Sequence, residues 1–155
     1  MSERVAIFPG SFDPFTVGHE NIVYRGLSLF DRIVISIGYN ANKSGCFSLE
    51  QREEWIRGVF VDESRVSVER YSGLTVDFAK SVGAQSILRG LRTSADFEFE
   101  RAIAQANKQM TNIDTVFLLT APEHTHVNSS IVRDIIKHGG DASLFLPKRL
   151  VIKGF

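Results

Sequence analysis

The stretch Val5-Ala6-Ile7-Phe8-Pro9-Gly10-Ser11-Phe12-Asp13-Pro14-Phe15-Thr16-Val17-Gly18-His19 decides how this chain folds. It begins with residues that favour a β-strand, turns at Pro9-Gly10, and reaches Thr16, whose hydroxyl suits the cap of a helix. A helix is expected to start near Thr16, because the residues after it place apolar side chains at spacings of three and four. This buried stripe consists of Ile22, Val23, Gly26, Leu27 and Phe30.

Strand-like and helix-like segments alternate through the rest of the chain. Further β-favouring runs lie at 33–37, 66–68, 86–88 and 116–119. Further helices are predicted at 75–82, 95–110 and 129–137, and one more begins at Ser48, which can form a capping box with Gln51. We expect Trp55 of that helix to lie in the core.

The runs at 33–37 and 116–119 are almost entirely apolar, which is typical of parallel strands covered on both faces. The pattern as a whole predicts an α/β fold built on a doubly wound, five-stranded parallel sheet, in a single domain that spans residues 1–155.

Polar residues gather directly after each predicted strand. The carboxyl ends of parallel strands meet at one edge of a sheet, and open sheets of this kind bind their ligands there. The five segments are 9–19, 40–43, 71–75, 89–92 and 122–130. We therefore expect them to converge on one site.

The first of these segments is suited to bind an anion. With Thr16 as the N-cap, Gly18 and His19 fall at the second and third positions of the helix. Free amides, the positive end of the helix dipole and an imidazole then converge, while Gly10 leaves room for a phosphate. Taken alone, Ser11 and Thr16 would be ordinary loop and capping residues.

The composition excludes several other functions. The chain has 18 basic and 18 acidic residues, so no overall field favours nucleic acid or an anionic membrane as a partner. No signal-like start and no apolar run of about 18 residues is present, which favours the cytoplasm. Cys46 is the only cysteine, and we interpret it as a bystander thiol.

Two motifs resemble those of a known superfamily. Thr16-Val17-Gly18-His19, opening a helix after a strand, is similar to the T-x-G-H signature of nucleotidyltransferases related to class I aminoacyl-tRNA synthetases. The segment Val127-Asn128-Ser129-Ser130-Ile131-Val132-Arg133 resembles the I-S-S-S-x-x-R/K segment of bacterial-type phosphopantetheine adenylyltransferases, with Asn128 in place of the usual first serine. Segments 73–78, 87–92 and 95–101 are also similar to that family, so the resemblance runs from Ile7 to Pro147.

The resemblance implies a role for individual residues. It implies that the acceptor is bound by Ser11, Lys43, Thr75 and Arg89, with Arg89 on its phosphate and Thr75 near the pantetheine arm. His19 would stabilise the transition state. The residues implied to bind ATP are Ser11, Phe12, His19, Gly90, Leu91, Arg92, Glu100, His124, Thr125, His126, Val127, Asn128, Ser129 and Ser130.

The charges and the histidines also have simpler interpretations. Lys43, Arg89 and Arg92 would be solvated surface residues in many proteins, although two arginines after a strand favour phosphate, which a guanidinium binds bidentately. His124 and His126 form an H-x-H pair with no third ligand nearby, so we expect them to line the nucleotide pocket and to hold no metal.

The expected reaction transfers the adenylyl group of ATP to 4′-phosphopantetheine, giving dephospho-coenzyme A and pyrophosphate, with Mg²⁺ as cofactor. A phosphate monoester is largely dianionic at neutral pH and needs no general base. The resemblance also implies a homohexamer and feedback binding of coenzyme A. Two alternatives stay open: adenylyl or cytidylyl transfer to another phosphorylated acceptor, such as nicotinamide mononucleotide or glycerol phosphate, and a non-catalytic nucleotide-binding module.

Overall fold

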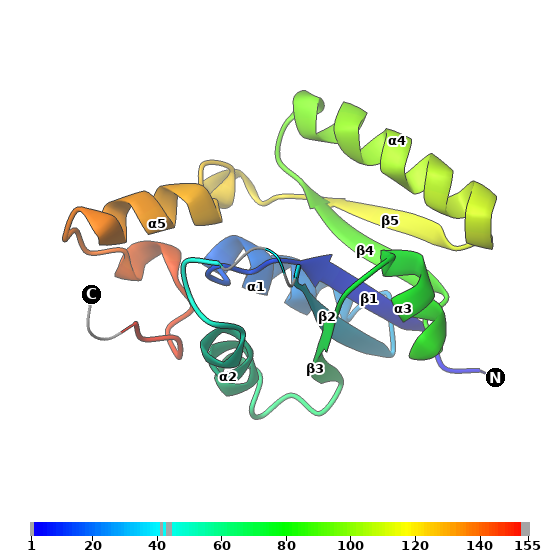
Figure 1. Cartoon of the computed structure of the whole chain (residues 1–155), viewed down its shortest axis with the longest axis horizontal. Coiled ribbons are helices and arrows are strands. Elements are labelled where there is room, and N and C mark those ends of the chain that lie inside the picture. The colour runs from blue at the N-terminus through cyan, green and yellow to red at the C-terminus, as the bar shows by residue number, and fades with distance from the viewer. Residues whose placement is uncertain (1, 41, 43–44, 153–155) are drawn as a thin grey trace.

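The computed structural model describes residues 2–40, 42 and 45–152. Within them, five parallel strands form one sheet in the order β3-β2-β1-β4-β5 (Figure 1). The strands are β1 (Val5–Gly10), β2 (Arg32–Gly38), β3 (Val66–Tyr71), β4 (Ser86–Leu91) and β5 (Asp114–Leu119). The helices are α1 (Val17–Gly26), α2 (Leu49–Val59), α3 (Thr75–Ser81), α4 (Ser94–Thr111) and α5 (Ser129–Lys137), with short 3₁₀ turns at Pro122–His124 and Ser143–Phe145. The predicted doubly wound α/β fold is confirmed.

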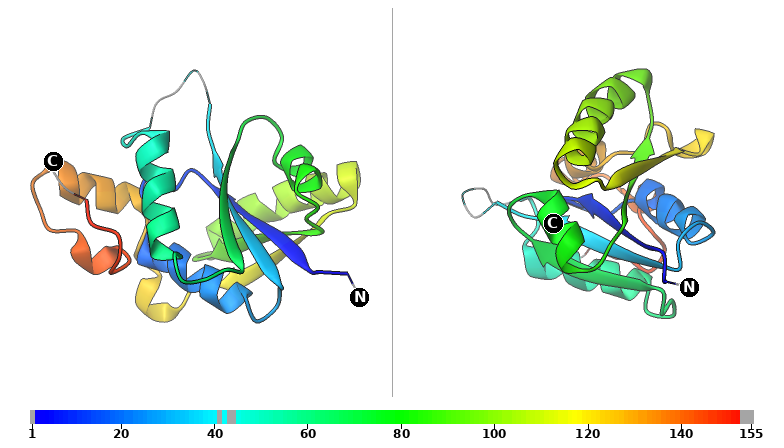
Figure 2. Two further views of the ribbon diagram at one scale, coloured as in Figure 1. Left: turned by 90° about the horizontal axis from the view of Figure 1, so that it is seen from below. Right: turned by 90° about the vertical axis from the view of Figure 1, so that its right-hand side faces the viewer.

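The sheet is covered by helices on both faces. Alternate residues of β1 point to opposite sides, so Ala6 and Phe8 join one core while Val5 and Ile7 join the other. Helices α1, α2 and α5 pack on the first face, and α3 packs on the second. Figure 2 shows α2 and α4 on opposite sides of the strands.

Capping side chains set two helix starts, as predicted. The Thr16 hydroxyl accepts the N–H of His19, and the His19 ring accepts the N–H of Thr16. Ser48 and Gln51 form the same reciprocal pair at the start of α2. Helix α1 ends at Gly26, earlier than its apolar stripe suggests, and Leu27 and Phe30 are buried from the turn that follows.

Two expectations about burial were wrong. Trp55 is only partly buried, at the margin of the core against Phe47. Strand β5 is an edge strand whose residues are partly buried or exposed, with Leu119 72% exposed, whereas five residues of β2 are buried. An apolar run indicates a surface that needs cover, but β5 has a neighbouring strand on one side alone, and Val116 and Leu118 are only partly buried against the core.

The strands end at nearly the same level, which brings the loops after them together. Gly10 pairs with Ile37, and Leu91 pairs with Leu119. Helix α5 lies beyond this carboxyl edge, to the left in Figure 1. No described helix combines the length and apolar character needed to span a bilayer.

Candidate active site

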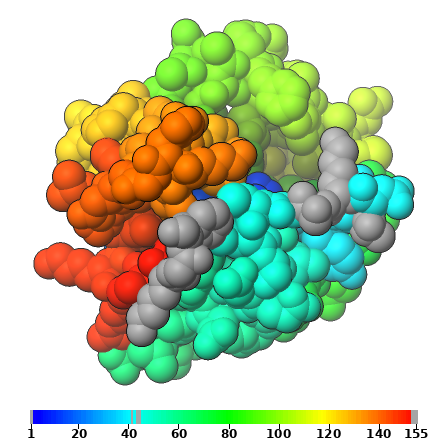
Figure 3. Space-filling model, turned by 60° about the vertical axis from the view of Figure 1, so that its left-hand side comes forward, coloured from blue at the N-terminus to red at the C-terminus, as the bar shows by residue number. Residues whose placement is uncertain are grey.

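A pocket of about 620 Å³ lies at the carboxyl edge, between the loop after β1 and the starts of α1, α4 and α5. In Figure 3, dark blue residues from the first part of the chain show at the bottom of a hollow bordered by α5 in orange, α4 in green and the α2 region in cyan. Among the predicted site residues, those that line the pocket are Ser11, Phe12, His19, Arg89, Gly90, Arg92, Glu100, Val127, Asn128, Ser129 and Ser130. Three of the five predicted loop segments, 9–19, 89–92 and 122–130, therefore meet here.

Hydrogen bonding fixes the tautomer of His19. The backbone N–H of Thr16 donates to Nδ1 of His19 at 2.9 Å. An Nδ1 that accepts carries no proton, so the neutral ring holds its proton on Nε2. His19 thus has an N–H donor left over, on a ring that lines the pocket.

The surroundings of His19 keep it neutral. Burial, followed by the positive charges of Arg89 and Arg92, lowers the pKa of His19 to about 3. The ring is enclosed by Phe12 at 5.0 Å and Phe15 at 5.2 Å between ring centroids. At neutral pH His19 is therefore a fixed, uncharged hydrogen-bond donor.

The loop after β1 is shaped by Gly10 and Phe12. Phe12 adopts a left-handed backbone with φ 49°, and its ring folds back over Gly10. A Cβ on Gly10 would lie 2.9 Å from Phe12 Cζ. Glycine is needed here because of this internal contact, and the room for a phosphate that the sequence suggested at Gly10 stays a prediction.

Arg89 is held by an acidic partner on α4, Glu100. Its Nε donates to both carboxylate oxygens of Glu100, at 3.2 and 3.1 Å, and its Nη2 also bonds Glu100 Oε1. Its Nη1 donates to the carbonyl of Pro9. The guanidinium is thus aligned beside the first loop, with a third of its side chain exposed.

Helix α5 is docked onto the same loop. Asn128 is its N-cap and accepts the N–H of Ile131 at 2.9 Å. The Ser129 hydroxyl donates to the Pro14 carbonyl at 2.8 Å. The free amides of two helices, α1 and α5, therefore open onto one pocket.

A second arginine of the pocket wall, Arg92, lies in the turn between β4 and α4. Thr93 caps α4 by accepting the N–H of Asp96. The Asp96 carboxylate accepts the N–H of Arg92 at 3.2 Å and lies 3.5 Å from Arg92 Nε. Arg92 is thus held just before the start of α4, on the pocket wall.

A smaller pocket of about 320 Å³ adjoins the first and shares Ser11, Arg89 and Glu100 with it. Thr75 lines this second pocket and bonds the Tyr71 hydroxyl at 2.9 Å. Its other walls include Phe99, Ile103 and Asn107. Arg89 thus lies at the junction of a polar pocket and a narrower one with apolar walls.

Some predicted site residues are not on the pocket walls. Leu91 is buried, and its carbonyl accepts the N–H of Thr120. His124, Thr125 and His126 lie at or just after the 3₁₀ turn that follows β5, outside the pocket lining. Lys43 lies outside the described residues.

Other lining residues had no role in the sequence interpretation. Arg133 was part of the α5 motif but received no role; its Nη2 donates to the Ser130 hydroxyl at 3.1 Å. Its position, four residues after the first motif serine, could have placed it on the same helix face as Ser129. Asp96 also received no role, although it lines the pocket and its carboxylate accepts the backbone N–H of Arg92.

The chain offers no preformed metal cage in its described part. No three His, Cys, Asp or Glu side chains are grouped there as a metal site. Mg²⁺ often binds through substrate phosphates and water with few protein ligands, so this donor set fits a Mg²⁺ ion carried by a nucleotide.

The fold also occurs in solved nucleotidyltransferases. A bifunctional NMN adenylyltransferase/ADP ribose pyrophosphatase from Francisella tularensis superposes with a TM-score of 0.74 at 17% identity, covering 94% of this chain and 45% of that longer chain. The same protein complexed with AMP and a manganese ion superposes with a TM-score of 0.69. The model of the cytidylyltransferase-like family matches residues 7–135. The fold, the site and this match define the class: the chain is a nucleotidyltransferase.

Similarity to individual proteins narrows the class. The chain is 55% identical over 150 residues to the phosphopantetheine adenylyltransferase of Flavobacterium johnsoniae, covering 97% of this chain and 99% of the relative. It is 50% identical to that of Bacteroides fragilis, covering 94% and 97%. The chain belongs to the phosphopantetheine adenylyltransferase family.

Proposed function

We propose that this single-domain chain transfers the adenylyl group of ATP to 4′-phosphopantetheine, giving dephospho-coenzyme A and pyrophosphate, as a step of coenzyme A biosynthesis in the cytoplasm. The observation that carries the proposal is the junction at Arg89, where a pocket with two helix N-termini meets a narrower one with apolar walls. The first suits a triphosphate, and the second suits an uncharged arm.

The proposed reaction is an in-line displacement. An oxygen of the acceptor phosphate forms a bond to the α-phosphorus of ATP, and the bond from that phosphorus to the bridging oxygen of pyrophosphate breaks. The acceptor dianion brings its own electron pair, so no side chain removes a proton. The protein must align two anions and stabilise charge on the α-phosphoryl group.

The described residues divide this task. Arg89, aligned by Glu100, holds the acceptor phosphate, and the neutral Nε2–H of His19 donates to the α-phosphoryl oxygens. Arg92, Arg133 and the α5 amides hold the β- and γ-phosphates. Bound Mg²⁺ supplies neutralising charge on the phosphates. Lys43 is proposed as a further ligand of the acceptor.

Helix α4 supports a proposed homohexamer. None of its residues, all of them described, is buried by the rest of the chain. Four apolar side chains of α4 are exposed, Phe97, Phe99, Ile103 and Met110, and so is Leu119 of the edge strand. Large apolar side chains exposed on one element and its neighbour favour an interface. Phe99 and Ile103 also line the narrower pocket, so assembly would complete the acceptor site. Coenzyme A has the same pantetheine arm and would bind at this site as well.

The direct test is incubation with ATP, Mg²⁺ and 4′-phosphopantetheine, followed by mass detection of dephospho-coenzyme A. Parallel reactions contain nicotinamide mononucleotide or glycerol 3-phosphate, each with ATP or CTP. If product formed only with nicotinamide mononucleotide or only with glycerol 3-phosphate, that compound would replace 4′-phosphopantetheine as the proposed substrate. Binding of ATP without pyrophosphate release under any acceptor would contradict the proposed activity and favour a non-catalytic module.

A further inference from the structure

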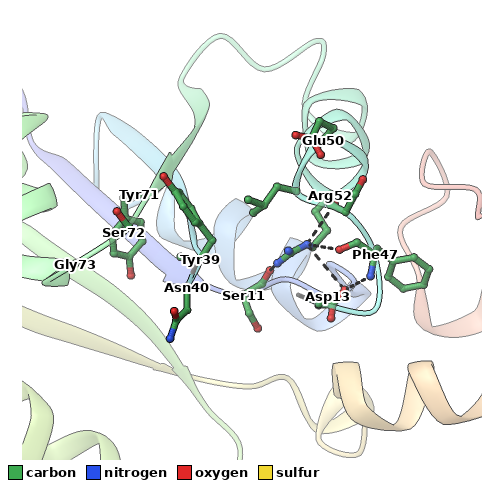
Figure 4. Close-up of a pocket in the computed structure, with 14 residues that line it drawn as sticks. Ser11, Asp13, Tyr39, Asn40, Phe47, Glu50, Arg52, Tyr71, Ser72 and Gly73 are labelled. Carbon is green, nitrogen blue, oxygen red and sulfur yellow. Dashed lines mark hydrogen bonds and ion pairs between the residues drawn. The ribbon is translucent and has the colours of Figure 1, made fainter. Parts of the chain in front are cut away.

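A buried ion pair connects the first loop to the start of α2. Arg52, in the first turn of α2, is only 6% exposed, and Asp13 is 7% exposed. Nε of Arg52 lies 3.9 Å from Oδ1 of Asp13. Figure 4 shows the two side chains meeting at the wall of a pocket of about 690 Å³ beneath α2.

Both partners are satisfied by hydrogen bonds that cross between the segments. The Asp13 carboxylate accepts the backbone N–H groups of Cys46 at 2.7 Å and Phe47 at 2.9 Å. Arg52 donates from Nε to the Phe47 carbonyl at 3.1 Å and from Nη1 to the Ser11 carbonyl at 2.8 Å. The pair therefore ties residues 46–47 to residues 11–13.

Fold stability is a weak explanation for such a pair. Burying two charges costs nearly as much as their attraction returns, and apolar residues of similar volume often stabilise a core as well or better. What apolar residues do not supply is the fixed direction of the bond to the Ser11 carbonyl. The pair is better explained by the geometry that it imposes.

Ser11 is the residue whose position this geometry controls. Its side chain is exposed and lines all three pockets at this edge of the sheet. Phe12 after it has a left-handed backbone, so the loop depends on outside contacts to keep this shape. The carbonyl of Asp13 accepts Nη1 of Arg133 from α5 at 2.8 Å, which fixes the far side of the same turn.

We propose that Arg52 and Asp13 are positioning residues for adenylyl transfer. They hold Ser11 where the pocket of about 620 Å³, proposed for ATP, meets the pocket of about 320 Å³, proposed for the acceptor arm. The proposal rests on the proposed function. The pair touches neither substrate and acts through the Ser11 backbone. Its loss should lower the turnover number more than it weakens ATP binding, because the other phosphate contacts remain.

The test is a double-mutant cycle between Ser11→Ala and Arg52→Lys, with the wild-type reaction as reference. Lysine keeps the charge near Asp13 but cannot bond both the Ser11 and Phe47 carbonyls. Arg52→Lys should lower kcat by about 10- to 100-fold with KM for ATP nearly unchanged. Ser11→Ala should lower kcat by about tenfold alone but less than about twofold in the Arg52→Lys background.

Arg57→Lys is the matched control on the same helix. Arg57 also bonds a carboxylate and a carbonyl, those of Glu53 and Val68, but lies away from the loop. It should keep wild-type kcat. Equal loss in both arginine variants, or a Ser11→Ala effect undiminished by Arg52→Lys, would overturn the positioning role.

Folding is checked by circular dichroism and by the melting temperature. If Arg52→Lys does not fold, Asp13→Asn, which leaves the guanidinium in place, should show the same loss of kcat per folded molecule. Failure of both variants to fold would assign the pair to stability and also contradict the proposal. An inactive wild-type chain would instead count against the proposed function.

Discussion

The backbone N–H of Thr16 donates to Nδ1 of His19 at 2.9 Å, and so the imidazole proton is placed on Nε2. Since the pKa of His19 is lowered to about 3, the ring stays neutral throughout the neutral range, with Nδ1 as acceptor and Nε2 as donor. The ring is a neutral donor in a pocket whose positive charge comes from arginines and helix termini.

Removing this donor should slow the chemical step. His19→Ala is expected to lower kcat by about 10²- to 10³-fold, as for the loss of one transition-state donor, with a smaller change in ATP affinity. Steady-state kinetics and calorimetric titration with ATP measure the two quantities. His138→Ala, at the exposed end of α5, is the control and should be fully active. An unchanged kcat for His19→Ala would remove His19 from the mechanism.

The lowered pKa of His19 predicts a pH-dependent stability. In the unfolded chain the imidazole takes up a proton below about pH 6.5, whereas in the folded chain it does so only near pH 3. The contribution of neutral His19 to the free energy of unfolding is therefore complete above about pH 6.5, and it is lost as the pH falls toward 3. The slope of the unfolding free energy between pH 6 and 4 should be flatter in His19→Gln, by up to ~1.4 kcal/mol per pH unit. Identical slopes from urea unfolding would contradict this pKa.

Arg89 is expected to bind the acceptor phosphate through N–H groups other than those that bond Glu100 and Pro9. Arg89→Lys loses the bidentate geometry and should raise KM for 4′-phosphopantetheine by about 10- to 100-fold, with less effect on KM for ATP. Lys43→Ala should likewise raise KM for 4′-phosphopantetheine. Arg25→Lys, on the exposed side of α1, is the control. Equal acceptor affinity in all of these variants would exclude Arg89 and Lys43 from the acceptor site.

Two helix glycines should respond in opposite directions. A Cβ on Gly26 would lie 2.7 Å from Leu88 Cδ2 and 2.9 Å from Ile33 Cδ1, so Gly26→Ala should destabilise the fold by about 1–3 kcal/mol. Gly58 in α2 has nothing within 4 Å of that position, and Gly58→Ala should stabilise by about 0.5–1 kcal/mol. Urea unfolding of both variants measures the difference. A neutral Gly26→Ala would show that α1 can move away from β4.

The exposed face of α4 should be an interface. Met110 and Leu119 are 56% and 72% exposed, and a charge at either position should dissociate the assembly. Sedimentation velocity on Met110→Glu and Leu119→Glu is expected to give smaller species than the wild type. Val61→Glu, equally exposed after α2, is the control. A monomeric wild type would contradict the hexamer proposal.

The sequence was most informative where interactions are short in range. The starts of α1 and α2 were predicted correctly, because each cap joins residues only three positions apart: Thr16 with His19, and Ser48 with Gln51. The strands were recognised from local runs, and their parallel order placed the loops at one edge. The roles assigned to the residues of those loops stay predictions.

Partners distant in the sequence could not be predicted. Arg89 was expected to face a phosphate, but its carboxylate partner Glu100 lies on another element. The exposure of β5 also escaped prediction, because an apolar run does not tell whether the chain or another molecule covers it.

By itself, then, the sequence determined the order of strands and helices, the edge at which the polar loops gather, and the family resemblance, since periodicity, capping and motifs are local properties. Only the tertiary structure decided which of the loop residues face one another. Asp13 meets Cys46, Phe47 and Arg52 across more than 30 residues of chain, and Arg133 reaches Asp13 across 120. Such pairs form because the sheet brings separate loops to one edge, and no local pattern records which side chains then lie within hydrogen-bonding distance.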